Sequence, residues 1–203
     1  MIRHIIFDLG NVLIHIHPDL VMKEFMERCH LTVDDIKNFY LSDLHLGFME
    51  GRFEPEEFYQ IMMRKFPAPL TAEEFIRIWE TVIGEPKQGI DQIITQLNRK
   101  YTLSVCSNTD PWHWTKVVRE IPMIKKFQHF FLSFEMKLNK PNPQVFKYLL
   151  AKLRAEGREC LFIDDTQENI QVAQEFGIQT IWSSDPKTIE QELNSLKVLA
   201  NLN

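Results

Sequence analysis

The sequence predicts an α/β fold: a doubly wound parallel sheet with a Rossmann-like core and an inserted helical cap domain. From residue 88 onward, short runs of β-branched and aromatic residues alternate with amphipathic helical patterns. Such alternation implies a parallel sheet covered by helices on both faces. One further strand pattern stands alone at the N-terminus, before a long stretch that carries only helical patterns. The economical division is therefore a core of residues 1–14 and 88–203 and a helical cap of residues 15–87.

The N-terminal strand covers residues 2–7 and ends at the segment Asp8-Leu9-Gly10-Asn11. Four helices are expected in the stretch that follows, because residues typical of helix starts precede apolar residues at helical spacing. These starts lie at Pro18, Thr32, Glu54 and Thr71.

In the core, five helices and four strands are expected after the cap. Their order is helix 88–99, strand 101–106, helix 111–120, strand 129–133, helix 142–155, strand 160–163, helix 167–176, strand 178–182 and helix 187–200. Every candidate reactive residue lies just beyond the end of an expected strand. In open parallel sheets this is the edge at which ligands bind.

Composition excludes several classes of protein. The chain has 203 residues, 44% of them hydrophobic and 25% charged, with a net charge of −5, which does not favour nucleic acid as a partner. Its apolar runs are far shorter than the roughly 20 residues that cross a bilayer, so no membrane association is expected. Strand-like sequence begins at once, without room for a secretion signal, and this favours the cytoplasm. The three cysteines form no metal or redox pattern, and buried packing is favoured over a catalytic thiol.

Four short segments satisfy the positional criterion for a site. Each is ordinary alone, as a turn, a loop or a helix cap, but packing does not explain all four in this order. The segments are Asp8-Leu9-Gly10-Asn11, Ser107-Asn108-Thr109-Asp110, Lys140-Pro141, and Asp164-Asp165 followed by Asn169.

These segments supply what phosphoryl transfer needs: a nucleophile, positive charge and hydrogen-bond donors. A carboxylate such as Asp8 can attack phosphorus only if cations offset the repulsion between two anions. Asp8 and Asp165 offer the oxygen ligands that Mg²⁺ prefers, and Lys140 adds a second positive charge. Ser107 and the amides after it can donate hydrogen bonds to the phosphate.

With these segments the chain resembles the haloacid dehalogenase-like superfamily, in its branch of small phosphatases with a helical cap after the first motif. The resemblance rests on four ordered motifs: residues 5–13, residues 105–108, residues 140–143, and residues 162–165 with Asn169. It implies an aspartyl-phosphate intermediate on Asp8 and Mg²⁺ held by Asp8, the Gly10 carbonyl and Asp165, with Asp164 supporting the metal site. It also implies that Ser107 and Asn108 bind the phosphate and that Lys140 bridges phosphate and nucleophile.

The chain departs from the family at Gly10, where most of its phosphatases have a second aspartate that acts as general acid and then general base. Such a group is worth about 10²–10⁴-fold in rate, so proton transfer must come from elsewhere or be weaker. His15 and His17 are the nearest alternative proton carriers, or else part of a hinge between core and cap. Some family members with the same Asp-Leu-Gly-Asn sequence are considered to act on sugar phosphates.

Two alternatives to a magnesium-dependent phosphatase of small phosphate monoesters stay open. Metal-independent 2-haloacid dehalogenases of the superfamily also lack the second aspartate, although the adjacent acids Asp164 and Asp165 would be costly without a cation. The other alternative is a catalytically weak family member that acts as a binding protein.

Substrate choice is expected in the cap, with residues 44–53 as a candidate substrate-facing loop or else a connection between helices. Asp110, Trp112, His113 and Trp114 could line the entrance, and the two tryptophans could equally be packing residues. A sugar phosphate is the leading substrate, and other small phosphorylated metabolites stay open. The sequence indicates no particular oligomeric state.

Overall fold

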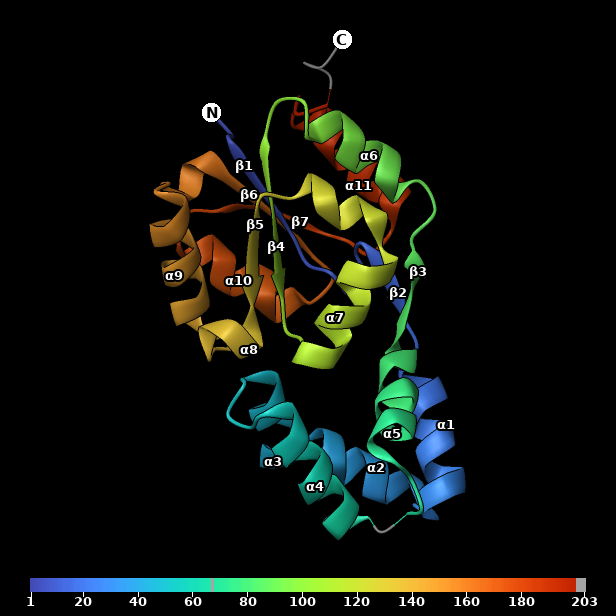
Figure 1. Cartoon of the computed structure of the whole chain (residues 1–203). Coiled ribbons are helices and arrows are strands. Elements are labelled where there is room, and N and C mark those ends of the chain that lie inside the picture. The colour runs from blue at the N-terminus through green and yellow to red at the C-terminus, as the bar shows by residue number, and fades with distance from the viewer. Residues whose placement is uncertain (67, 200–203) are drawn as a thin grey trace.

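A five-stranded parallel sheet forms the centre of the molecule in the computed structural model, which describes residues 1–66 and 68–199 (Figure 1). The strands follow the order β5-β4-β1-β6-β7. Their bounds are β1 His4–Phe7, β4 Thr102–Ser107, β5 His129–Leu132, β6 Cys160–Asp164 and β7 Gln179–Trp182. The N-terminal strand is central, because it pairs in parallel with both β4 and β6.

Helices cover both faces of this sheet, and the predicted doubly wound α/β fold is confirmed (Figure 1). Alternate residues of β1 point to opposite faces: Ile5 packs with α6, α7 and α11, whereas Ile6 packs with α9 and α10. The helices are α6 Ile90–Leu97, α7 Pro111–Glu120, α8 Ser133–Met136, α9 Pro143–Leu153, α10 Gln167–Glu175 and α11 Pro186–Ser195. Short 3₁₀ helices lie at η1 Glu80–Val82, η2 Pro122–Lys126 and η3 Gly157–Glu159.

Five helices between β2 and β3 pack together beside the carboxyl ends of the sheet strands, and we call them the helical block (Figure 1). They are α1 Pro18–Cys29, α2 Val33–Tyr40, α3 Asp43–Met49, α4 Pro55–Lys65 and α5 Ala72–Trp79. The four expected starts are confirmed, and Thr32 and Thr71 both form complete capping boxes.

The fifth helix, α3, was not expected, since residues 44–53 were considered as a loop. Ser42 caps this helix by accepting a hydrogen bond from the His45 amide. Phe48 is fully buried and stacks on Phe58 of α4, with ring centroids 4.0 Å apart. This aromatic packing favours a helix despite Gly47.

A two-stranded antiparallel ribbon, β2 Ile14–Ile16 and β3 Ile83–Pro86, joins the helical block to the sheet (Figure 1). The sequence analysis missed this ribbon, because strands of three and four residues are too short to show a periodic pattern. Within the described residues, no helix is long and apolar enough to cross a membrane. Residue 67 of the expected cap and residues 200–203 of the expected core and last helix lie outside the described residues.

Candidate active site

A pocket of about 330 Å³ opens between the carboxyl edge of the sheet and the helical block. The core contributes polar residues at or just after the ends of β1, β4 and β6, including Asp8, Ser107 and Asp165. The helical block contributes Tyr40, His45 and Met49. Strand ends therefore converge at the edge where the sequence analysis predicted a site.

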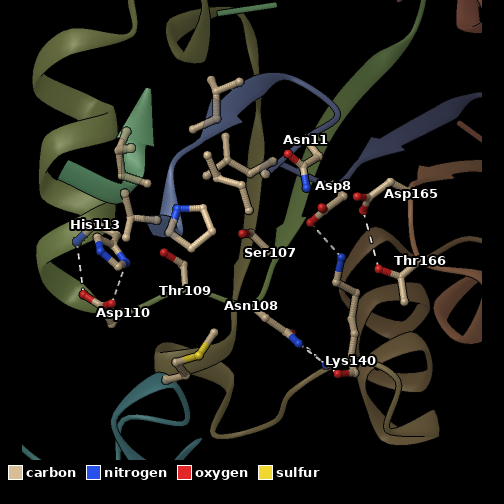
Figure 2. Close-up of a pocket in the computed structure, with 18 of the residues that line it drawn as sticks. Asp8, Asn11, Ser107, Asn108, Thr109, Asp110, His113, Lys140, Asp165 and Thr166 are labelled. Carbon is tan, nitrogen blue, oxygen red and sulfur yellow. Dashed lines mark hydrogen bonds and ion pairs between the residues drawn. The ribbon is translucent and has the colours of Figure 1, made fainter. Parts of the chain in front are cut away.

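The Lys140 ammonium lies between two carboxylates at the base of this pocket. Its Nζ is 2.8 Å from Asp8 Oδ1 and 2.6 Å from Asp164 Oδ2 (Figure 2 shows the contact with Asp8). Only 2% of the Lys140 side chain is exposed, so these charge-assisted bonds are largely shielded from water. Residues separated by 132 positions in the sequence thus form one ion pair.

Asn108 fixes the backbone of Lys140 through two reciprocal hydrogen bonds. The Lys140 amide donates to Asn108 Oδ1, and Asn108 Nδ2 donates to the Lys140 carbonyl, both at 2.8 Å (Figure 2). The peptide bond between Lys140 and Pro141 is cis. These bonds use Oδ1 and one hydrogen of Nδ2, so the second Nδ2 hydrogen and the backbone amide of Asn108 are the donors it could offer a phosphate.

Asp164 is completely buried, and its two oxygens accept four hydrogen bonds. Lys140 and the Thr166 amide each donate one, and Asn169 Nδ2 lies 3.0 and 3.1 Å from the two oxygens. A carboxylate held in this way is a fixed acceptor that orients Lys140. The sequence analysis expected Asp164 to support the metal site, which stays a prediction; the contacts that the structure shows are with Lys140, Thr166 and Asn169.

Burial and charge act in opposite directions on this group. Burial raises the pKa of Asp8 to about 6, although the Lys140 ammonium opposes the rise. Burial alone would lower the pKa of Lys140, but the carboxylates of Asp8 and Asp164 outweigh it and hold that pKa well above its usual range. Lys140 is therefore held in its charged form by the two carboxylates.

Oxygen atoms suited to a divalent cation lie beside this ion pair. One ligand atom each from Asp8, Asp164 and Asp165 lie within 4.8 Å of one another. Three carboxylates face a single ammonium, which leaves a local excess of negative charge that one divalent ion would neutralise. All-oxygen donors fit Mg²⁺, and Asp8 and Asp165 are placed to hold it because Asp164 is already occupied.

Hydroxyl and amide groups line the pocket beside the carboxylates. Ser107 is 4% exposed and, among the described residues, its hydroxyl has no hydrogen-bond partner. In Figure 2 the Ser107 and Thr109 oxygens lie between Asp8 and the far side of the pocket, and Asn11 lies next to Asp8. Asn11 has a positive φ of 58°, which asparagine tolerates better than most residues.

Gly10 lines the pocket where a second aspartate is expected in the family. A Cβ at this position would lie 3.3 Å from Ile16 Cγ2 of β2, which is a tight contact. The alternating side chains of β2 place Ile14 and Ile16 in the pocket. His15 and His17 are not among the described residues that line it, and instead their rings stack on each other. His15 lies in β2 and His17 directly precedes α1, where the chain passes from the sheet to the helical block.

A second polar cluster lies across the pocket from Lys140, where α5 of the helical block meets α7 (Figure 2). His113 Nδ1 is 2.6 Å from Asp110 Oδ2, and His113 Nε2 is 2.9 Å from the carbonyl oxygen of Trp79. The Trp79 indole also donates to Asp110 at 3.0 Å. Both nitrogens of His113 face acceptors, so both carry protons and the ring is cationic.

The charges of this pair stabilise each other. Although burial opposes ionisation, Asp110 raises the pKa of His113, and His113 together with the Trp79 indole lowers the pKa of Asp110. Both residues line the pocket, as considered from the sequence. Trp112 instead packs on Phe48 and Trp114 on Phe130, which agrees with packing for the tryptophans.

The sequence analysis did not single out Tyr40 and His45 individually as pocket residues. His45 lies within the segment considered for substrate contact, but Tyr40 belongs to α2, whose pattern indicated only an amphipathic helix. All three cysteines are buried and unbonded, as expected for packing residues.

The family is settled by comparison with known proteins. The family model described as haloacid dehalogenase-like hydrolase matches residues 2–177, and the chain belongs to this family of hydrolases. The family and enzyme class predicted from the sequence are therefore confirmed.

Two relatives share nearly the whole length of the chain. D-ribitol-5-phosphate phosphatase of Bacteroides thetaiotaomicron is 24% identical over 200 residues, which cover 95% of this chain and 97% of the relative. The crystal structure of a haloacid dehalogenase family enzyme from the same organism, in complex with magnesium and inorganic phosphate, is 28% identical with a TM-score of 0.81. The match covers 90% of this chain and 94% of the chain in that crystal structure.

A dehalogenase is less similar. The L-2-haloacid dehalogenase PA0810 is 16% identical with a TM-score of 0.67, over 90% of this chain and 84% of its own. At this identity the likeness shows a shared fold.

Proposed function

We propose that this chain is a magnesium-dependent phosphatase that hydrolyses small phosphate monoesters through a phosphorylated Asp8. The observation that carries the proposal is the Lys140 ammonium, held 2.8 Å from Asp8 and 2.6 Å from Asp164, with Asp165 alongside. This arrangement allows a carboxylate to approach an anionic phosphorus.

Mg²⁺, held by Asp8, Asp165 and the Gly10 carbonyl, would neutralise charge on the phosphate oxygens. The chain's own residues orient the ester: the Ser107 hydroxyl and the Asn108 amide donate to the phosphate, and Lys140 holds nucleophile and phosphate together. Asp8 displaces the alcohol and forms an acyl phosphate. Water then cleaves that bond, so that one ester and one water give one alcohol and one phosphate.

The helical block would act as a cap that covers the ester and contacts its leaving group. A pocket of about 330 Å³ lies at the small end of the range for ligand sites, which favours a small metabolite. The ribitol phosphate phosphatase among the relatives makes a sugar or polyol phosphate the leading candidate. Placement of the protein in the cytoplasm remains a prediction from the sequence.

The charge arrangement favours a phosphatase over a dehalogenase. Three carboxylates around one ammonium leave an excess of negative charge that a divalent cation would offset, whereas metal-independent chemistry would leave it unbalanced.

Phosphate release from a panel of phosphorylated metabolites, with magnesium and then with a chelator, tests the proposal. We expect release that requires magnesium and disappears in the Asp8→Asn variant. Halide release from 2-haloacids that persists in chelator would establish the dehalogenase instead. If both wild type and the Asp8→Asn variant bound phosphate esters without turnover, the binding-protein alternative would be favoured.

A further inference from the structure

Two side chains of the helical block that line the pocket each have a polar atom without a hydrogen-bond partner among the described residues. They are the His45 imidazole on α3 and the Tyr40 hydroxyl at the end of α2, and both residues line the pocket. Within the described part of the chain, neither His45 Nε2 nor the Tyr40 hydroxyl has a hydrogen-bond partner. Such groups carry an energetic cost unless water or a ligand satisfies them.

The tautomer of His45 is set by a backbone carbonyl. His45 Nδ1 lies 3.1 Å from the carbonyl oxygen of Tyr40, and a carbonyl oxygen only accepts, so Nδ1 carries the proton. Burial lowers the pKa of His45 and keeps the ring neutral. In that form Nε2 is an acceptor, the group that a substrate hydroxyl requires.

Aromatic packing fixes the orientation of both side chains. The His45 ring lies 4.9 Å from the Tyr40 ring, 5.2 Å from Phe39 and 6.0 Å from Trp79. Only 9% of His45 is exposed. A side chain packed in this way loses little further entropy when it binds a ligand, which favours selective recognition.

Charge on the pocket wall narrows the class of leaving group. Among the described residues that line the pocket, Lys140 is the one lysine or arginine, and it is engaged by Asp8 and Asp164. The His113 cation is engaged by Asp110. A leaving group with its own carboxylate would therefore have no unengaged cation on this wall to pair with. An uncharged leaving group with several hydroxyls could instead hydrogen-bond to His45 Nε2 and to the Tyr40 hydroxyl.

We propose that His45 and Tyr40 determine specificity by hydrogen-bonding hydroxyl groups of the leaving alcohol, so that the pocket selects uncharged polyol or sugar phosphates over carboxylated ones. This inference rests on the proposed phosphatase function. The core binds the phosphate at Asp8, and the helical block binds the hydroxyl groups at the other end of the ester. Ile14, Ile16 and other apolar residues that line the pocket would pack on the carbon chain.

The test compares kcat/KM for three esters: a pentitol 5-phosphate, phenyl phosphate without free hydroxyls, and phosphoglycolate with a carboxylate. Tyr40→Phe removes one hydroxyl. His45→Phe removes both ring nitrogens, and His45→Asn keeps an N–H near the Nδ1 position but removes Nε2. Tyr59→Phe is the matched control, because the Tyr59 hydroxyl donates to the Leu70 carbonyl and Tyr59 does not line the pocket.

We expect each Tyr40 and His45 variant to lower the pentitol-to-phenyl ratio of kcat/KM about three- to tenfold, the value of one neutral hydrogen bond. The control should retain the wild-type ratio, and wild type should prefer the pentitol ester to phosphoglycolate. An unchanged ratio in the Tyr40 and His45 variants, or a preference for phosphoglycolate, would overturn the inference while leaving a phosphatase. Absence of magnesium-dependent phosphate release from all three esters would instead overturn the proposed function, and this inference with it.

Discussion

The two walls of the pocket differ in how their ionisable side chains are satisfied. On the core wall, Asp164 accepts hydrogen bonds from Lys140 and Asn169, and the Lys140 ammonium also donates to Asp8. On the wall formed by the helical block, the Tyr40 hydroxyl and His45 Nε2 have no hydrogen-bond partner among the described residues. The difference suggests that the core is preorganised for a constant reaction, whereas the helical block keeps hydrogen-bonding capacity for a particular substrate.

The largest effect is expected at the proposed nucleophile. Asp8→Asn should reduce kcat by at least about 10³-fold, because the amide cannot form the acyl phosphate. Phosphate release under saturating substrate and magnesium measures it. Asp34→Asn, an exposed carboxylate on α2, is the matched control and should keep wild-type turnover. Retained turnover in the Asp8 variant would show that the nucleophile is not Asp8.

Removal of the central cation should affect both activity and stability. Lys140→Met leaves Asp8 and Asp164 facing each other without the ammonium, and breaking a buried ion pair in this way costs about 3–5 kcal/mol. Urea denaturation should show the lower free energy of unfolding, and kcat should fall about 10²-fold or more. Lys23→Met, at an exposed position of α1, should change neither quantity. A Lys140 variant of wild-type stability would contradict the ion pair described for the core wall.

The contact between the walls should depend on pH. The pKa of His113 is raised, so its contribution to stability is complete below about pH 6.5 and is lost as pH rises through the folded-state pKa. The pKa of Asp110 is lowered, so its contribution is present above about pH 4 and is lost on acidification. His113→Gln should therefore lower the free energy of unfolding by about 3 kcal/mol at pH 6.

The loss should become smaller as pH rises through the folded-state pKa of His113, because wild type itself then loses the cation. Denaturation of both proteins at pH 5, 6, 8 and 9 measures the difference. A difference that does not shrink as pH rises would contradict a cationic His113 that is held by Asp110 and contacts the Trp79 carbonyl of α5.

The smallest effect is expected where α3 touches α8. The buried Ser133 hydroxyl lies 2.6 Å from the Met49 carbonyl of the helical block and 2.9 Å from the Thr109 amide, whose proton it accepts. Ser133→Ala should lower the free energy of unfolding by about 1–2 kcal/mol, because it leaves the Thr109 amide unpaired. Thermal unfolding measures the loss. A rise in KM with unchanged kcat would show that this contact holds the helical block over the substrate. If neither the free energy of unfolding nor KM changed, the contact would have no role in joining the two walls.

Several features of the fold and site were predictable because they depend on local sequence. Capping boxes at Thr32 and Thr71 use residues three positions apart, and the alternation of strands and helices is visible along the chain. The position of Asp8 just after β1 follows from the same alternation. The short ribbon β2–β3 and the helix α3 were missed, because pairing and aromatic burial, rather than local periodicity, stabilise them.

The sequence by itself determined the α/β class, the family and the set of residues that gather at the sheet edge, because strand ends in a parallel sheet must meet there. Only the tertiary structure decided which partner each side chain takes. The Asn108 side chain is engaged by the Lys140 backbone, His15 and His17 lie outside the pocket, and His45 and Tyr40 lie within it. These outcomes depend on contacts between segments distant in the chain, whose geometry no local pattern encodes.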